Sequence, residues 1–185
     1  MANQTQPPGQ PSSASDGGPD EETIRLATQI FNAAREGDTE NFRRWLAQGL
    51  PPNMRNQKGD SLLMLASYHG HVETTRVLIE HGADPELRND NGQNPLAGAA
   101  FKGNLAMVRL LLESGAEIDG SSPDGKTALM FAAMFDHSEI VACLLAKGAD
   151  RHARESKGMT AHDLATAMGA KATPAQLARP ADTGG

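Results

Sequence analysis

The stretch DGKTALMFAAMFDHSEIVACLLAKGAD, residues 124–150, contains the pattern that decides the fold. It opens with Asp124-Gly125, a turn signal, followed by Thr127, whose hydroxyl can cap a helix by accepting a hydrogen bond from a free backbone N–H. We expect a short helix over residues 128–135 and a second over 138–147, where apolar residues recur at helical spacing. The stretch therefore predicts a unit of two helices joined by a tight turn.

This unit recurs with a period of 33 residues. Four columns share the period: Gly37, Gly70, Gly103, Asp136 and Gly169; Gly49, Gly82, Gly115 and Gly148; Gly59, Gly92, Gly125 and Gly158; Ala33, Ala66, Ala99, Ala132 and Ala165. A fixed period of this size indicates stacked units, none of which buries its apolar face alone. The alanine column predicts close helix packing. Asp136 replaces glycine at a position that we expect to have a left-handed backbone, which Asp tolerates.

The repeats resemble those of the ankyrin family. The motifs that carry the resemblance are KGDSLLMLASYHGHVETTRVLIEHGAD (58–84), NGQNPLAGAAFKGNLAMVRLLLESGAE (91–117) and the stretch quoted first. The segment IFNAAREGDTENFRRWLAQGLPPN (30–53) lacks the opening turn and looks like an N-terminal cap, while KGMTAHDLATAMG (157–169) keeps only the first helix. The family's Thr-Pro-Leu-His tetrad is degraded in every unit, which removes a hydrogen bond that usually ties neighbouring units together.

The resemblance implies an all-α ankyrin-repeat solenoid of four to five stacked helix-turn-helix units with short β-hairpin turns. We place the repeat domain at residues 21–170, with units at about 22–55, 56–88, 89–121 and 122–154 and a partial cap at 155–170. Residues 1–20 are rich in Pro, Gly, Ser and Gln and are predicted to be disordered. Residues 171–185 are predicted to be a flexible C-terminal tail.

Composition narrows the classes of partner and the compartment. The formal net charge of −6 argues against nucleic acid, which needs a concentrated basic surface. No stretch approaches the roughly 20 apolar residues that span a membrane, and the N-terminus lacks the features of a secretory signal. We expect a cytoplasmic monomer, with export by a non-classical route left open. The one cysteine, Cys143, falls in a column held elsewhere by Val77 and Leu110, so we expect a buried, inert thiol.

Three histidines, His69, His71 and His81, lie close together in SYHGHVETTRVLIEHG and suggest metal ligands. However, other units fill the same positions with unrelated polar or large residues. His71 and His81 would begin and end one helix, some 15 Å apart at the ~1.5 Å rise per residue of an α-helix, too far for bonds of ~2 Å to one ion. We therefore predict no metal site.

No nucleophile–base arrangement, phosphate-binding glycine loop or pair of buried carboxylates is evident, so we predict no catalytic residue and no cofactor. A column of arginines on the second helices, Arg43, Arg76 and Arg109, has two interpretations. One is a solvated outer face paired with acids such as Glu40 and Glu73. The other is a phosphate-binding stripe.

The resemblance implies that partners dock in a concave groove lined by the first helices and the turns between units. On the first helices this points to Tyr68, Phe101 and Met134, again 33 residues apart, with their neighbours His69, Lys102 and Phe135. At the turns the predicted contact residues are Arg55, Lys58, Asp60, Arg88, Asp90, Gln93, Asp124 and Lys126. Aromatic and Met side chains are typical of interface hot spots. The alternative is that Tyr68, Phe101 and Met134 fill gaps between neighbouring helices.

These observations favour a non-enzymatic module that binds a partner protein through the groove as an adaptor, inhibitor or regulator. The chain also resembles small ankyrin proteins of bacteria. Two more specific roles stay open. One is a stress-protective accessory protein that supports a partner enzyme, and the other is a secreted effector that acts on host proteins.

Overall fold

The computed structural model describes residues 20–178. The predicted disordered segment 1–20 lies outside the described residues except for Asp20, as does the last part of the chain from residue 179. Within the described range the chain forms ten helices: α1 (Glu21–Glu36), α2 (Thr39–Ala47), α3 (Leu62–Tyr68), α4 (Val72–Glu80), α5 (Pro95–Lys102), α6 (Leu105–Glu113), α7 (Ala128–Met134), α8 (Ser138–Ala146), α9 (Ala161–Met168) and α10 (Thr173–Ala178).

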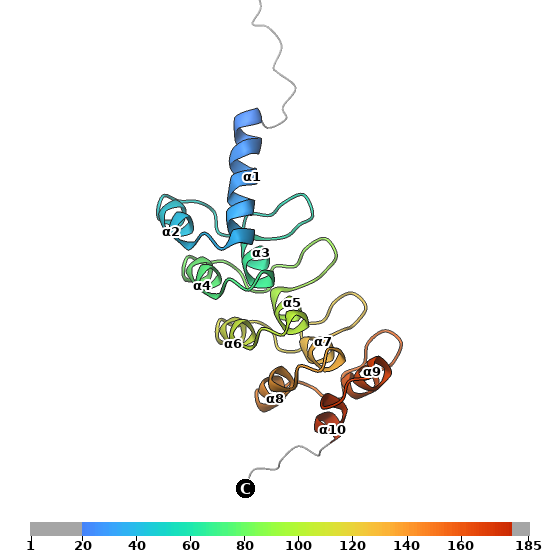
Figure 1. Ribbon diagram of the computed structural model, residues 1–185. Coiled ribbons are helices and arrows are strands. Elements are labelled where there is room, and N and C mark those ends of the chain that lie inside the picture. Colours follow the sequence, from blue (N-terminus) through green and yellow to red (C-terminus); the bar gives the residue numbers. More distant parts are fainter. Residues whose placement is uncertain (1–19, 179–185) are drawn as a thin grey trace, which may run out of the picture.

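The helices stack in two layers (Figure 1). Helices α1, α3, α5, α7 and α9 contact one another in succession and form the inner layer, while α2, α4, α6 and α8 form the second. The loops that enter α3, α5, α7 and α9 all project to the same side of the stack. This arrangement confirms the predicted all-α solenoid of helix pairs. No helix in the part of the chain that the structure describes has both the length and the apolar character needed to cross a membrane.

The hairpin loops between units are closed by hydrogen bonds rather than by strands. In the loop before α3, the Asn56 N–H donates to the Asp60 carbonyl at 3.0 Å, and the Gly59 N–H donates to the Asn56 carbonyl at 3.0 Å. Within residues 20–178 the only isolated β-bridge pairs Arg55 with Ser61. The predicted hairpin turns are therefore present as five-residue loops with minimal β structure.

The helix ends follow the capping residues in the sequence. Thr127 accepts a hydrogen bond from the Met130 N–H at 3.4 Å, and Asn94 accepts one from the Ala97 N–H at 2.8 Å with Pro95 in the first turn. Asp136 has φ = 59°, which confirms the left-handed backbone expected where other units have glycine. The alanine column is buried throughout, because the inner helices approach one another most closely there.

The C-terminal boundary needs correction. Residues 171–178 were predicted to belong to a flexible tail, but residues Thr173–Ala178 form α10, which packs against α9, α8 and α7. Asp136 accepts hydrogen bonds from three successive N–H groups, those of Lys171 (3.1 Å), Ala172 (3.0 Å) and Thr173 (2.9 Å). The Thr173 hydroxyl donates to the Ala133 carbonyl at 2.9 Å. The residue that breaks the glycine column therefore holds the N-terminal end of the last helix.

Candidate functional site

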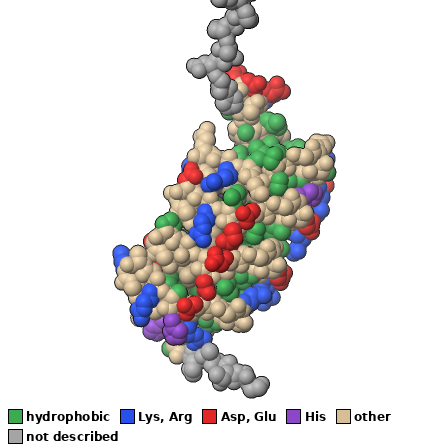
Figure 2. Space-filling view, turned by 180° about the vertical axis from the view of Figure 1, so that it is seen from behind, with side chains coloured by type: hydrophobic (Ala, Val, Ile, Leu, Met, Phe, Trp, Pro, Cys, Tyr) green, Lys and Arg blue, Asp and Glu red, His purple; other side chains and the backbone are tan. Residues whose placement is uncertain are grey.

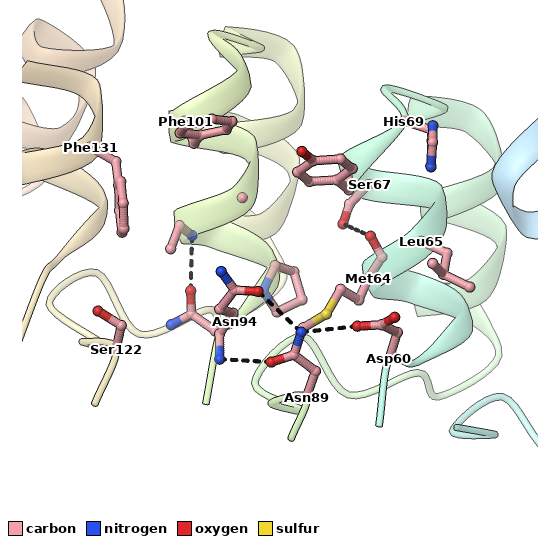
Figure 3. Close-up of a pocket in the computed structure, with 15 residues that line it drawn as sticks. Asp60, Met64, Leu65, Ser67, His69, Asn89, Asn94, Phe101, Ser122 and Phe131 are labelled. Carbon is pink, nitrogen blue, oxygen red and sulfur yellow. Dashed lines mark hydrogen bonds between the residues drawn. The ribbon is translucent and has the colours of Figure 1, made fainter. Parts of the chain in front are cut away.

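A hollow of about 420 Å³ opens on the side of the inner helices that faces the hairpin loops (Figure 3). We call it the central hollow, because it lies between α3, α5 and α7 in the middle of the stack. Its lining comprises Asp60, Met64, Leu65, Ser67, Tyr68, His69, Asn89, Gln93, Asn94, Pro95, Ala97, Gly98, Phe101, Ser122 and Phe131. Five of these, Asp60, Tyr68, His69, Gln93 and Phe101, were predicted as contact residues from the sequence. The structure therefore brings part of the predicted site together around one cavity.

The central hollow exists because α5 lacks a side chain where its neighbours have large ones. Leu65 in α3 and Phe131 in α7 occupy the same position of the 33-residue repeat as Gly98 in α5. Leu65 is buried, and Phe131 is half-buried against the core. The alignment of the repeats already shows that Gly98 stands where Leu65 and Phe131 stand in the neighbouring units. The prediction of contact residues used the large side chains and did not include Gly98.

Aromatic side chains form the outer walls. Tyr68 is 41% exposed and Phe101 is 38% exposed, although the rest of the large apolar residues on α3 and α5 are buried. The Phe101 ring makes edge-on contacts with Phe131, at 6.3 Å between centroids, and with Phe135, at 4.8 Å. The three residues predicted at 33-residue spacing, Tyr68, Phe101 and Met134, therefore differ in exposure. Tyr68 and Phe101 are open to solvent, while Met134 is half-buried against the core and Phe135 is the exposed residue at that end.

Two basic side chains lie beside Tyr68. The Lys102 Nζ is 5.1 Å from the centroid of the Tyr68 ring, a cation–π distance, and the His69 ring is 5.6 Å away with edge-on geometry. Partial burial lowers the pKa of His69 below its ordinary value, and the neighbouring His71, Lys102 and Arg35 lower it further. His69 therefore presents a neutral imidazole at neutral pH.

On the hairpin side of the hollow, the Asp60 carboxylate belongs to a network of hydrogen bonds with side-chain amides. Asp60 accepts a hydrogen bond from the side-chain amide of Asn56 at 3.1 Å. It accepts another from the side-chain amide of Asn89 at 2.9 Å (Figure 3). Asn89 is itself buried and donates also to the Gln93 side chain at 3.1 Å. These bonds hold Asp60 and Gln93 in fixed positions at the edge of the hollow.

Two of the predicted contact residues have structural roles that the sequence did not reveal. Arg55 donates to the Gly59 carbonyl in its own loop at 2.9 Å and to the Arg88 carbonyl in the next loop at 2.8 Å. Arg88 repeats the pattern one unit later, donating to the Gly92 carbonyl at 3.1 Å and the Ser121 carbonyl at 2.5 Å. Successive hairpins are therefore joined by guanidinium groups.

The remaining hairpin residues differ in how accessible they are. Asp90 pairs with Arg55 at 3.4 Å yet keeps 64% of its side chain exposed. Lys58 is exposed and engages its neighbours through its backbone. Lys126 and Asp124 form an ion pair with each other, and the hydrogen bond from Lys126 is the main reason that the pKa of Asp124 is lowered.

Two of the three histidines that suggested a metal site instead bond to backbone carbonyls. His71 Nε2 lies 2.7 Å from the Arg35 oxygen, and His81 Nδ1 lies 2.8 Å from the Val77 oxygen. Among residues 20–178 no group of three or more His, Cys, Asp or Glu side chains is placed to hold a metal ion. The expectation that the protein binds no metal stays a prediction.

The second helices form a charged outer face. Glu73 pairs with Arg43 of the preceding unit at 2.5 Å and with Arg76 at 3.8 Å, all three side chains being about half exposed. The predicted pairing of Arg76 with Glu73 is confirmed. Cys143 differs from expectation, because it is half-buried between α6 and α8 rather than buried.

Acidic side chains also connect the loops that follow the second helices. Glu86 accepts a hydrogen bond from the Glu117 N–H at 2.9 Å, and Asp119 accepts one from the Asp150 N–H at 3.0 Å. Figure 2 shows Asp and Glu side chains gathered in a band down the middle of the face seen from behind the view of Figure 1.

Comparison with known proteins agrees with this geometry. A family model described as ankyrin repeats (3 copies) matches residues 30–122 and 116–181. The chain belongs to the ankyrin repeat family. It is also similar to the ankyrin repeat protein PA3287 of Pseudomonas aeruginosa, with 58% identity over 50 residues, which make up 27% of this chain. The match spans 29% of that relative's own length. Ankyrin repeats generally mediate protein–protein interactions.

Proposed function

We propose that this ankyrin repeat protein is a non-enzymatic scaffold that binds a partner protein across the central hollow. The observation that carries the proposal is the exposure of Tyr68 and Phe101 in the lining of that hollow, on helices whose other large apolar residues are buried. Exposed aromatic side chains around a concavity are typical of interface hot spots, and apolar surface of this kind is uncommon without a partner.

The backbone around the hollow is held in place before any partner arrives. Arg55 and Arg88 join successive hairpins, and the Asp60–Asn89–Gln93 bonds fix the polar edge. Little conformational entropy is therefore lost from this side of the interface on binding. The half-exposed Tyr68 and Phe101 bury further apolar area in a complex.

A paired set of variants tests the proposal. Affinity purification with the tagged full chain from its native cells, followed by mass spectrometry, identifies the partners. The double variant Tyr68→Ala/Phe101→Ala should weaken binding of the true partner by about 30-fold or more, as expected for loss of one hot spot of about 2 kcal/mol. The matched control, Arg76→Ala/Arg109→Ala on the outer face of α4 and α6, should leave it unchanged.

Circular dichroism and the melting temperature must stay close to wild type in both variants. Retention of the partner by the folded Tyr68→Ala/Phe101→Ala variant, with loss by the outer-face variant, would contradict the proposal. Unfolding of the Tyr68→Ala/Phe101→Ala variant would show that these side chains fill space between helices. The accessory role and the effector role differ only in the partner, so the identity of the purified protein distinguishes them.

A further inference from the structure

Gly98 has no structural requirement to be glycine. It lies in the interior of α5, a helix that runs Pro95–Lys102, and its φ is not in the left-handed region that favours glycine. A Cβ atom added there would meet Tyr68 Cδ2 at 3.5 Å, an ordinary van der Waals contact. Glycine within a helix is destabilising relative to alanine. Neither backbone geometry nor packing accounts for it.

What Gly98 does is keep the central hollow open. Large side chains stand at the same repeat position in the units on either side, Leu65 and Phe131, and both line the hollow. A side chain of that size at position 98 would project into the cavity between them. The resulting volume of about 420 Å³ falls within the roughly 300–1,000 Å³ of ligand pockets.

The hollow has an apolar interior and an acidic edge. Met64, Tyr68 and Phe131 supply apolar surface (Figure 3). Asp60 lines the hairpin side and accepts hydrogen bonds from neutral amides only, whereas Asp90 in the next hairpin is paired with Arg55 at 3.4 Å. With a formal net charge of −6 on the whole chain, the charge complement of this edge is a basic group.

We propose that the hollow beside Gly98 is an anchor subsite for one large apolar side chain, presented by an extended segment of a partner protein with a Lys or Arg next to it facing Asp60. This inference rests on the proposed function, because it names the chemistry of the partner at the same groove. Gly98 is then a specificity-determining residue: its missing side chain is the space that the partner fills.

The test uses a phage-displayed library of random dodecapeptides selected against the full chain, with affinities of enriched peptides measured by isothermal titration calorimetry. The enriched sequences should share a large apolar residue adjacent to Lys or Arg. Gly98→Leu should weaken these peptides at least 10-fold, and Gly98→Ala should weaken them by a smaller factor. Asp60→Asn should reduce affinity several-fold at low salt and remove the preference for the basic residue.

The two proposals fail in different ways. If Gly98→Leu binds as wild type while Tyr68→Ala/Phe101→Ala does not, the groove binds partners and the anchor subsite is wrong. If neither variant changes affinity, both proposals are wrong. Should Gly98→Leu fail to fold by circular dichroism, unchanged binding to Gly98→Ala, which has room for its methyl group, overturns the subsite. If the selection enriches no peptide, the proposal of an extended segment as the occupant is wrong. The affinity purification then tests partner binding at the groove independently.

Discussion

His71 Nε2 lies 2.7 Å from the carbonyl oxygen of Arg35, which precedes it by 36 residues in the neighbouring unit. The same contact recurs two repeats later, where His137 Nε2 lies 3.2 Å from the Phe101 carbonyl oxygen. The imidazole of each lies against a glycine of the preceding unit, Gly37 or Gly103. These histidines therefore join units in a chain whose Thr-Pro-Leu-His tetrad, the family's usual source of such a bond, is degraded.

Removing this tie should weaken the stack. We expect His71→Ala to lower the free energy of unfolding by about 1 kcal/mol, the typical net contribution of one hydrogen bond. Urea denaturation at pH 7.5 measures this. His81→Ala is the matched control, because its ring bonds within its own helix, to Val77, and joins no units. A His71→Ala protein as stable as the wild type would show that His71 is not an inter-unit tie.

Asp136 should govern the attachment of α10. Backbone hydrogen bonds from Thr173 and Lys171 are the main reasons that the pKa of its carboxyl is lowered. Because the folded pKa lies below the unfolded value of about 3.9, the stabilisation is present above that value and is lost as pH falls through the folded pKa. We expect Asp136→Gly to speed amide hydrogen exchange in α10 at neutral pH. Glu139→Gln, an exposed carboxylate change on α8, should not.

An acid titration separates this role from a general effect of charge. The protection of α10 amides, taken relative to their intrinsic exchange rate at each pH, should fall below about pH 4, as the Asp136 carboxylate becomes protonated. In Asp136→Asn the pH-dependent part should be absent, because the amide oxygen cannot be protonated in this range. If α10 exchanges at the same rate in the wild type and Asp136→Gly, the three backbone bonds do not hold the helix.

The sequence was sufficient for the architecture because the repeat period encodes it many times over. Gly37, Gly70 and Gly103 mark the same turn in successive units, and Thr127 and Asn94 cap helices as their side chains require. By contrast, α10 was missed because TPAQLA is short and has one large apolar residue, Leu177. Its position depends on Asp136, which lies outside any local window.

The site was only partly predictable for a related reason. Column comparison identified Tyr68 and Phe101, because large side chains at turn-adjacent positions are visible in the sequence. The position of Gly98 was equally visible, but the absence of a side chain is informative only once Leu65 and Phe131 are seen to line the same cavity. The bonds from Arg55 to the next hairpin depend on how closely successive loops approach, which the period alone does not specify.

Arg88 provides a test of the hairpin bonds. Its guanidinium donates to the carbonyls of Gly92 and Ser121, so Arg88→Ala should lower the free energy of unfolding by about 1 kcal/mol. Arg88→Lys should recover little of this, since a single ammonium cannot reproduce the guanidinium geometry. Lys58→Ala, an exposed hairpin change, is the control and should be nearly neutral. Thermal denaturation of the three variants measures the effect, and a stable Arg88→Ala protein would contradict it.

Metal should have no effect on the fold. His71 and His81 already bond to backbone carbonyls, and the two lie at opposite ends of α4. Dialysis against EDTA and subsequent addition of one equivalent of Zn²⁺ should leave the melting temperature unchanged. Stoichiometric zinc in the purified protein by elemental analysis, together with a lower melting temperature after EDTA, would contradict the prediction.

Gly98→Ala should separate stability from binding. Alanine is favoured over glycine within a helix by about 0.5–1 kcal/mol, and the added Cβ meets Tyr68 Cδ2 at 3.5 Å without a clash. We therefore expect Gly98→Ala to raise the free energy of unfolding by about that amount in urea denaturation, while weakening any ligand that fills the hollow. Ala99→Gly, in the same helix but at a buried position, is the matched opposite change and should destabilise the protein. A loss of stability in Gly98→Ala would mean that the glycine is required by packing, and the argument that it is retained for binding would no longer hold.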